Sequence, residues 1–155
     1  FLREENRLRM SPKVIKNYKL IGRQMDIAVK EIRHMYTKTF KEHAIDLTIE
    51  QWPILAVLYD YGSLSQVEIA DNIMRFPQSL SATIKLLIKK GYVIKEKSKK
   101  DKRSHNISLT QRGKEIVETT FPHVKHIRKQ QWDNLSEEDY DKFFSIIEQI
   151  RKNVN

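Results

Sequence analysis

The sequence predicts a mainly helical α+β fold in which one small β-hairpin interrupts a series of helices. Apolar residues recur at helical spacing over most of the chain, and only four Gly and four Pro interrupt its 155 residues. Between residues 92 and 110 the spacing changes to that of short strands. The length suits one domain with a substantial core rather than two large domains.

An apolar stripe near the N-terminus predicts a first helix of about thirty residues, or about 45 Å. Its members are separated by steps of three and four positions and are Val14, Tyr18, Ile21, Met25, Ala28, Ile32 and Met35. A helix of this length must pack against another element along most of its length. The stripe alone does not reveal whether it packs across its own domain or against a second chain.

Two capping boxes predict the starts of two short helices. Thr48 and Gln51 form a T-x-x-Q box, and Ser65 and Glu68 form an S-x-x-E box. The expected helices span residues 49–59 and 66–74.

The next helix is expected to begin at Pro77, which suits a first helical turn, and to end at Lys90 before Gly91. Its apolar face is formed by Leu80, Ile84, Leu87 and Ile88. Its outer face carries Gln78, Ser81, Ala82, Lys85 and Lys89. A short helix, a tight turn and a second helix with a polar outer face have the layout of a helix-turn-helix.

Two predicted strands, at residues 92–97 and 106–110, follow Gly91 and are joined by a charged loop. A β-hairpin directly behind the second helix of a helix-turn-helix is called a wing. Thr110 is expected to begin a further helix. Ser136, with Asp139 three residues later, is expected to cap the last one.

Positive charge is concentrated on this helix and hairpin. The window from Lys85 to Arg103 holds nine Lys or Arg residues against Glu96 and Asp101, which is +7 of the net charge of +9. Charge focused on a helix and an adjoining loop indicates a polyanionic partner, and duplex DNA fits best. The alternative is a solvated hairpin with no partner.

Other classes of protein are disfavoured by what the sequence lacks. It has no Cys, so disulfides and thiolate metal sites are excluded. Its longest apolar run, 53–59, is far below the ~20 residues of a membrane span, and residues 1–10 lack a signal-peptide core. We therefore expect a cytoplasmic protein without a membrane partner. Enzyme motifs such as a phosphate loop or H-E-x-x-H are missing, so we predict no enzymatic activity and no cofactor.

Histidines and aromatic residues offer two weaker hypotheses. His123 and His126 are three residues apart, with His34 and His43 elsewhere, but without further ligands we predict no metal site. An apolar ligand pocket between the first, second and fifth helices has as candidates Tyr18, Tyr36 and Trp52, with Phe40 and Phe121 nearby. The same residues suit a core. The pattern favours the core for Trp52 and leaves Tyr18 and Tyr36 open.

Five segments between residues 47 and 115 resemble the MarR family of bacterial winged helix-turn-helix transcriptional regulators in order and spacing. They are LTIEQWPIL (47–55), GSLSQVEIA (62–70), KKGYV (89–93), DKR (101–103) and ISLTQRGKE (107–115). The resemblance implies a single domain over residues 1–155. In it, a winged helix-turn-helix at residues 47–113 is flanked by dimerisation helices at 11–46 and 114–155. It also implies a homodimer that binds a pseudo-palindromic operator in double-stranded DNA, usually as a repressor, and that is released by a small-molecule effector.

The family pattern places the helix at 77–90 in the major groove and the wing at 95–106 at the minor groove. The DNA-binding residues that it implies are Ser65, Gln66, Gln78, Ser79, Ser81, Lys85, Lys97, Lys99, Lys100, Asp101, Lys102 and Arg103. Arg103 matches the family Arg that enters the minor groove, and Asp101 matches the acid that orients it. The wing lysines are interpreted as phosphate contacts. Many relatives carry an Arg at the position of Ala82, which leaves the base preference open.

Two other functions compete with a sequence-specific regulator. One is an adaptor whose winged helix binds a protein, although the basic wing argues against this. The other is an architectural DNA-binding protein that responds to no ligand and has little sequence preference.

Overall fold

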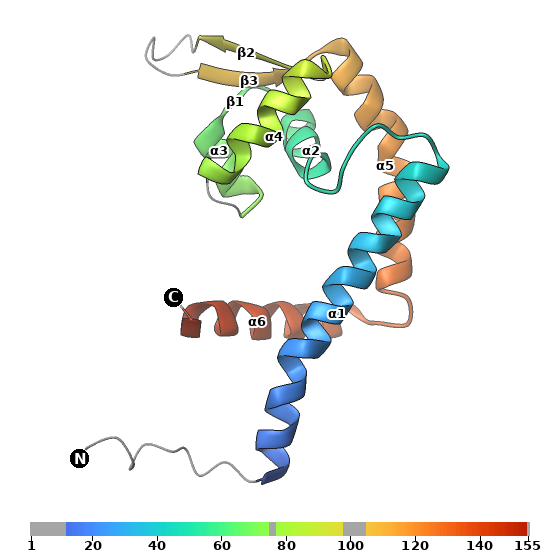
Figure 1. Cartoon of the computed structure of the whole chain (residues 1–155), viewed down its shortest axis with the longest axis vertical. Coiled ribbons are helices and arrows are strands. Elements are labelled where there is room, and N and C mark those ends of the chain that lie inside the picture. The colour runs from blue at the N-terminus through green and yellow to red at the C-terminus, as the bar shows by residue number, and fades with distance from the viewer. Residues whose placement is uncertain (1–11, 75–76, 98–104, 155) are drawn as a thin grey trace, which may run out of the picture.

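The computed structural model describes residues 12–74, 77–97 and 105–154, with side chains from residue 20 onward. Its elements in chain order are α1 (Pro12–Glu42), α2 (Trp52–Tyr61), β1 (Leu64–Ser65), α3 (Gln66–Asn72), α4 (Pro77–Lys89), β2 (Val93–Lys97), β3 (His105–Leu109), α5 (Gln111–Gln131) and α6 (Glu137–Val154). In Figure 1, α2, α3, α4 and the sheet form one compact group, from which α1 and α5 extend together. Helix α6 lies apart from this group and runs across the direction of α1.

The sheet has three antiparallel strands in the order β1-β3-β2. Strands β2 and β3 form the expected hairpin, with Val93 opposite Leu109 and Lys97 opposite His105. Strand β1 was not expected: Leu64 pairs with Ile107 and Ser65 with Asn106. It joins the residues that precede α3 to the base of the wing.

Helix α2 begins later than the expected residue 49. The predicted reciprocal bonds are present, because the backbone N–H of Thr48 donates to Gln51 Oε1 and that of Gln51 donates to Thr48 Oγ1. These bonds close a turn, and the helix starts only at Trp52. The reason is Pro53, which has no N–H to donate to the carbonyl of Ile49 and so interrupts the helical pattern there.

The helix-turn-helix forms as predicted, with shorter helices. Ser65 Oγ accepts from the backbone N–H of Glu68, whose carboxylate accepts from the N–H of Ser65, and α3 ends at Asn72. Helix α4 ends at Lys89, and Gly91 adopts the left-handed conformation with φ 73°. The expected apolar face was wrong in one residue, since Ile88 is 39% exposed. Leu80, Ile84 and Leu87 alone complete the buried side.

The core is centred on α2, whose Ile54, Leu55 and Leu58 are at most 1% exposed. Fully buried side chains from the surrounding elements are Ile69, Leu80, Leu87, Val93, Ile107, Val124 and Ile127. Among the described side chains of α1, from residue 20 onward, those that are buried lie near its C-terminal end, at Tyr36 and Phe40. Helix α6 buries no residue in the single chain.

The start of α5 is anchored on the wing. Thr110 caps the helix by accepting from the N–H of Gly113, and its own hydroxyl lies 2.6 Å from Gly91 O. Gly113 is buried against the backbone of Tyr92, where a Cβ atom would lie only 2.0 Å from the carbonyl oxygen. Ser136 and Asp139 cap α6 with reciprocal bonds, as predicted.

Candidate nucleic-acid interface

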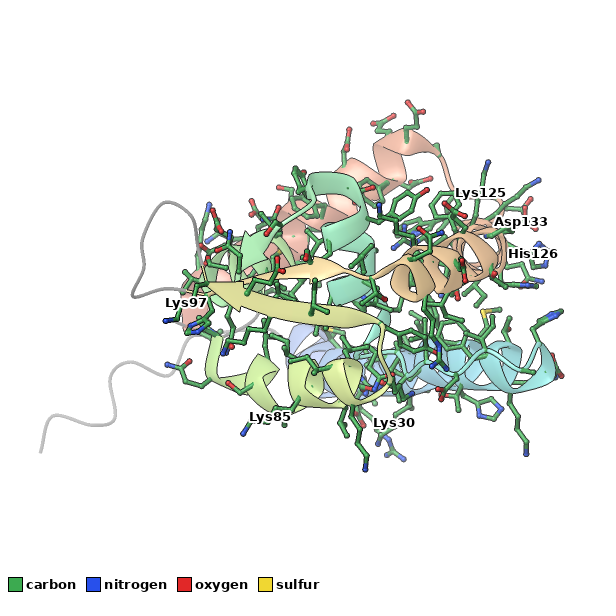
Figure 2. All side chains as sticks on the ribbon, turned by 90° about the horizontal axis from the view of Figure 1, so that it is seen from above. Lys30, Lys85, Lys97, Lys125, His126 and Asp133 are labelled. Carbon is green, nitrogen blue, oxygen red and sulfur yellow. The ribbon has the colours of Figure 1, made fainter. Side chains whose placement is uncertain are left out.

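Helix α4 and strand β2 carry a row of exposed lysines. Lys85 and Lys89 lie on α4, and Lys95 and Lys97 lie on β2 with only Glu96 between them. Figure 2 shows Lys97 at the left end of the molecule and Lys85 pointing away from its lower side, whereas Lys125 and His126 lie at the right. Lys89 and Lys95 were not among the predicted contact residues, although both lie in the basic window.

These lysines are not neutralised by described acidic side chains. Within the described residues, no ion pair involves Lys85, Lys89, Lys95 or Lys97. Unpaired, solvated ammonium groups on one face repel each other and favour an anionic partner. The positive field of this face is therefore available to phosphate groups.

Lys90 differs from the neighbouring lysines, because its charged group is hydrogen-bonded within the protein. Its Nζ donates to the carbonyl and carboxylate oxygens of Asp46, at 2.9 and 2.8 Å, and to Gln51 Oε1 at 3.2 Å. Tyr92 Oη donates to the other oxygen of Asp46, and burial, together with the charge of Asp46, raises the pKa of Tyr92. The end of α4 and the first residues of the wing are thus tied to the segment that links α1 and α2.

The predicted contact residues at the start of α3 are engaged within the protein. The Ser65 hydroxyl serves the capping box. Gln66 Nε2 donates to Pro77 O and to Ser81 Oγ, so it joins α3 to the first turn of α4. On α4 itself, Gln78, Ser79 and Ser81 are exposed, as a DNA-contacting role requires.

The tip of the wing lies outside the described residues. This applies to five predicted contact residues, Lys99, Lys100, Asp101, Lys102 and Arg103. Of the predicted wing residues, Lys97 alone falls within the described part of the chain. It ends β2 opposite His105, and both side chains are exposed.

A cavity of about 490 Å³ lies between α2 and α5. Trp52, Ala56, Val117 and Phe121 give it an apolar wall, and Arg128 adds a cation. Trp52 is 3% exposed and its Nε1–H has no partner among the described residues. A buried indole N–H without an acceptor is uncommon. Because this nitrogen is itself buried, it is not open to a ligand in the cavity.

The opposite, polar edge of this cavity holds a hydrogen-bonded pair. Tyr59 Oη donates to Glu118 Oε1 at 3.0 Å, and this bond raises the pKa of Tyr59. Of the other predicted pocket residues, Tyr36 is a core residue that packs edge-to-face on Phe40. Tyr18 belongs to the part of α1 whose side chains are outside the description.

Two of the histidines form a ring contact. The rings of His43 and His123 lie 3.9 Å apart, which joins the end of α1 to α5. His34 and His126 are exposed. Across the described part of the chain, no group of three or more His, Cys, Asp or Glu side chains is placed to hold a metal ion.

Two large apolar surfaces remain uncovered. On α1, the stripe residues Ile21, Met25 and Ile32 are 38–53% exposed. On α6, the exposed apolar residues are Tyr140, Phe143, Phe144, Ile146, Ile150 and Val154. None of the described helices has the length and apolar character needed to cross a bilayer. Exposed apolar surfaces of this size are typical of interaction sites.

Comparison with known proteins agrees with this architecture. The MarR family model matches residues 47–105. An HTH-type transcriptional regulator of Bacillus cereus is 27% identical over 108 residues, which cover 69% of this chain and 71% of the relative. The HTH-type transcriptional regulator SarZ of Staphylococcus epidermidis is 33% identical over 90 residues, which cover 58% of this chain and 60% of SarZ.

Solved structures share the fold. A MarR mutant from E. coli complexed with operator DNA gives a TM-score of 0.73 at 18% identity, over 84% of this chain and 92% of that one. MepR of S. aureus in complex with DNA gives 0.75 at 22% identity, over 86% of this chain and 97% of that one. The predicted fold class is confirmed.

Proposed function

Since residues 47–105 make this chain a member of the MarR family of winged helix-turn-helix transcriptional regulators, we propose that it is a homodimeric repressor that binds operator DNA. In this proposal residues 47–113 bind the duplex, and residues 11–46 and 114–155 form the dimer. Such a protein acts on chromosomal DNA in the cytoplasm. The observation that carries the proposal is the set of unpaired lysines on α4 and β2.

Helix α4 is the element proposed to enter the major groove. Its 13 residues give a rod about 20 Å long, and the groove is about 12 Å wide. Gln78, Ser79 and Ser81 face outward from its first two turns, where side chains reach base edges. Lys85, Lys89, Lys95 and Lys97 would neutralise phosphates, and Arg103 would enter the minor groove beside Asp101.

The uncovered apolar faces of α1 and α6 support the homodimer. Phe143 and Phe144 are 53% and 44% exposed in the single chain, which is costly for neighbouring aromatic side chains in water. A second copy would bury both helices at once and present two α4 helices side by side. Two half-sites about one helical turn apart would then be contacted together.

The cavity between α2 and α5 supports release by a small molecule. Its apolar wall and the Arg128 guanidinium suit a flat apolar ligand that carries an acidic group. A ligand there would contact α2 in the DNA-binding region and α5 in the dimerisation region. Its binding would therefore couple to the separation of the two α4 helices.

Selection of bound duplexes from a random pool tests the proposal. A dimeric repressor should recover an inverted repeat. Affinity for it should fall steeply with salt, because each phosphate contact releases counterions. Lys85→Ala and Lys97→Ala should each weaken binding by ~1–3 kcal/mol and lower the salt slope by about one. Lys125→Ala, on an exposed lysine at the opposite end of the molecule, is the matched control and should change neither quantity.

Three results would contradict the proposal. If the protein bound no duplex at low salt, DNA would be excluded as its partner. Equal affinity for the selected and random duplexes would favour an architectural role. A solution mass equal to that of one chain would exclude the dimer.

A further inference from the structure

The residue Gln66 makes two hydrogen bonds that connect the two helices of the helix-turn-helix. It is the first residue of α3, and its Nε2 lies 2.6 Å from Pro77 O and 2.8 Å from Ser81 Oγ. Pro77 and Ser81 are one helical turn apart on α4, at the end proposed to contact bases.

The partners fix the orientation of the Gln66 side-chain amide. Pro77 O is a carbonyl oxygen and can only accept, so the amide atom beside it must be the NH₂ group. The second hydrogen of that group then points to Ser81 Oγ. In this bond the Ser81 hydroxyl is the acceptor, and its own hydrogen is left to donate elsewhere.

A helical Ser or Thr hydroxyl commonly donates to the carbonyl four residues earlier. In this chain Thr37 donates to Arg33 O and Thr119 donates to Glu115 O. For Ser81 the equivalent atom is Pro77 O, whose two lone pairs are required by the helical N–H of Ser81 and by Gln66. Since Ser81 is exposed, its hydrogen is left for water or for a partner outside the protein.

We propose that Gln66 is a positioning residue that makes the Ser81 hydroxyl a hydrogen-bond donor toward base edges, so that Ser81 selects bases with a major-groove acceptor. This inference rests on the proposed function. Guanine offers N7 and O6, thymine offers O4 and adenine offers N7, whereas cytosine presents only its amino donor. Cytosine is therefore disfavoured at the one base position that faces Ser81.

The test measures base preference in three variants. The probe is the duplex recovered by selection, with all four bases placed in turn at each position of one half-site. The wild type should bind the cytosine duplex about three- to tenfold more weakly at one position, the range expected for one neutral hydrogen bond. Ser81→Ala and Gln66→Met should reduce this discrimination to less than about twofold. Ser81→Ala removes the hydroxyl donor, and Gln66→Met leaves the Ser81 hydroxyl free to rotate and to accept as well as donate.

The third variant, Gln66→Glu, cannot replace the amide, because its carboxylate can only accept and would face the carbonyl oxygen of Pro77. It should therefore lose the discrimination against cytosine as Gln66→Met does, although it keeps the shape of Gln. A merely structural role for Gln66 would lower affinity for all duplexes together and would leave the order of the bases unchanged. Lys97→Ala is the control that should lower affinity without changing the order of the bases.

A second readout needs no DNA. In the free protein, the side-chain amide protons of Gln66 should have chemical shifts unlike those of solvated Gln residues, and Ser81→Ala should move one of them. Solvent-like shifts would overturn the inference, as would an unchanged base preference in Gln66→Met and Gln66→Glu. Failure of the wild type to bind any duplex would overturn the proposed function as well, so the two failures are distinguishable.

Discussion

Replacing Gly113 with Ala should destabilise the protein, although Ala is the better helix former. Gly113 lies in the first turn of α5 and is buried against the wing. An added Cβ would meet Tyr92 O at 2.0 Å, its carbonyl carbon at 3.0 Å and Leu109 Cδ2 at 3.2 Å. Because the closest of these atoms belongs to backbone, a side-chain rotation cannot relieve the contact.

The magnitude follows from the movement that is required. The contact with Tyr92 O must lengthen by about 1 Å, and overpacking of this kind costs ~1–3 kcal/mol. The same carbonyl accepts bonds from Thr110 N at 3.0 Å and Thr110 Oγ1 at 3.2 Å, each worth ~0.5–1.5 kcal/mol. The gain in helix propensity is ~1 kcal/mol. We expect a net loss of ~1–5 kcal/mol, or about 2–20 °C in Tm for a chain of this size.

Urea and thermal unfolding at one fixed protein concentration measure the effect, because the stability of the proposed dimer would depend on concentration. Gly22→Ala is the matched control, since an added Cβ in the middle of α1 meets nothing within 4 Å of the same chain. It should stabilise the protein by up to ~1 kcal/mol. If Gly113→Ala were as stable as the wild type, the close packing of α5 on the wing would be refuted.

Three further changes have defined outcomes. Lys90→Met removes the bonds to Asp46 and should cost ~1–3 kcal/mol in urea unfolding, whereas Lys89→Met, which breaks no described ion pair, should be nearly neutral. Asp139→Asn should destabilise the protein at pH 7 but not at pH 2. Hydrogen bonds from the backbone and side chain of Ser136 lower the pKa of Asp139 below its usual 3.8. The stability that the Asp139 carboxylate contributes is therefore present above pH 3.8 and is lost as the pH falls through the pKa of the folded state. Urea unfolding of both proteins at the two pH values measures this difference. Phe143→Lys should shift the solution mass toward one chain, as measured by light scattering; an unchanged mass would exclude α6 from the interface.

The sequence was most informative where the structure depends on neighbouring residues. The capping boxes at Ser65 and Ser136, the end of α4 at Gly91 and the change from helix to hairpin all depend on a few adjacent positions. Periodicity also separated the buried face of α4 from its outer face, with Ile88 as the error. A hydrophobic residue on a helix stripe becomes core only if another element reaches it, and periodicity carries no information about that element.

Interactions between distant positions were out of reach. Strand β1 is two residues long, and its pairing with β3 depends on the completed fold rather than on a local pattern. Similarly, the family resemblance predicted Gln66 as a DNA contact, but its amide bonds to α4 could not be predicted because they require the final crossing of the two helices. Lys85 and Lys90 are the same residue type in the same basic window, so the sequence does not distinguish their roles. The folded position of Asp46 shows that Lys90 has a structural role, whereas Lys85 is exposed.

The short pairing between β1 and β3 links the helix-turn-helix to the wing. Ser65 is both a partner of Asn106 in the sheet and the residue at which α3 is capped. If α4 and the wing bind DNA as proposed, this link should hold their major-groove and minor-groove contacts at one separation. Double-stranded RNA, with its deep, narrow major groove, should then bind more weakly than DNA of the same sequence.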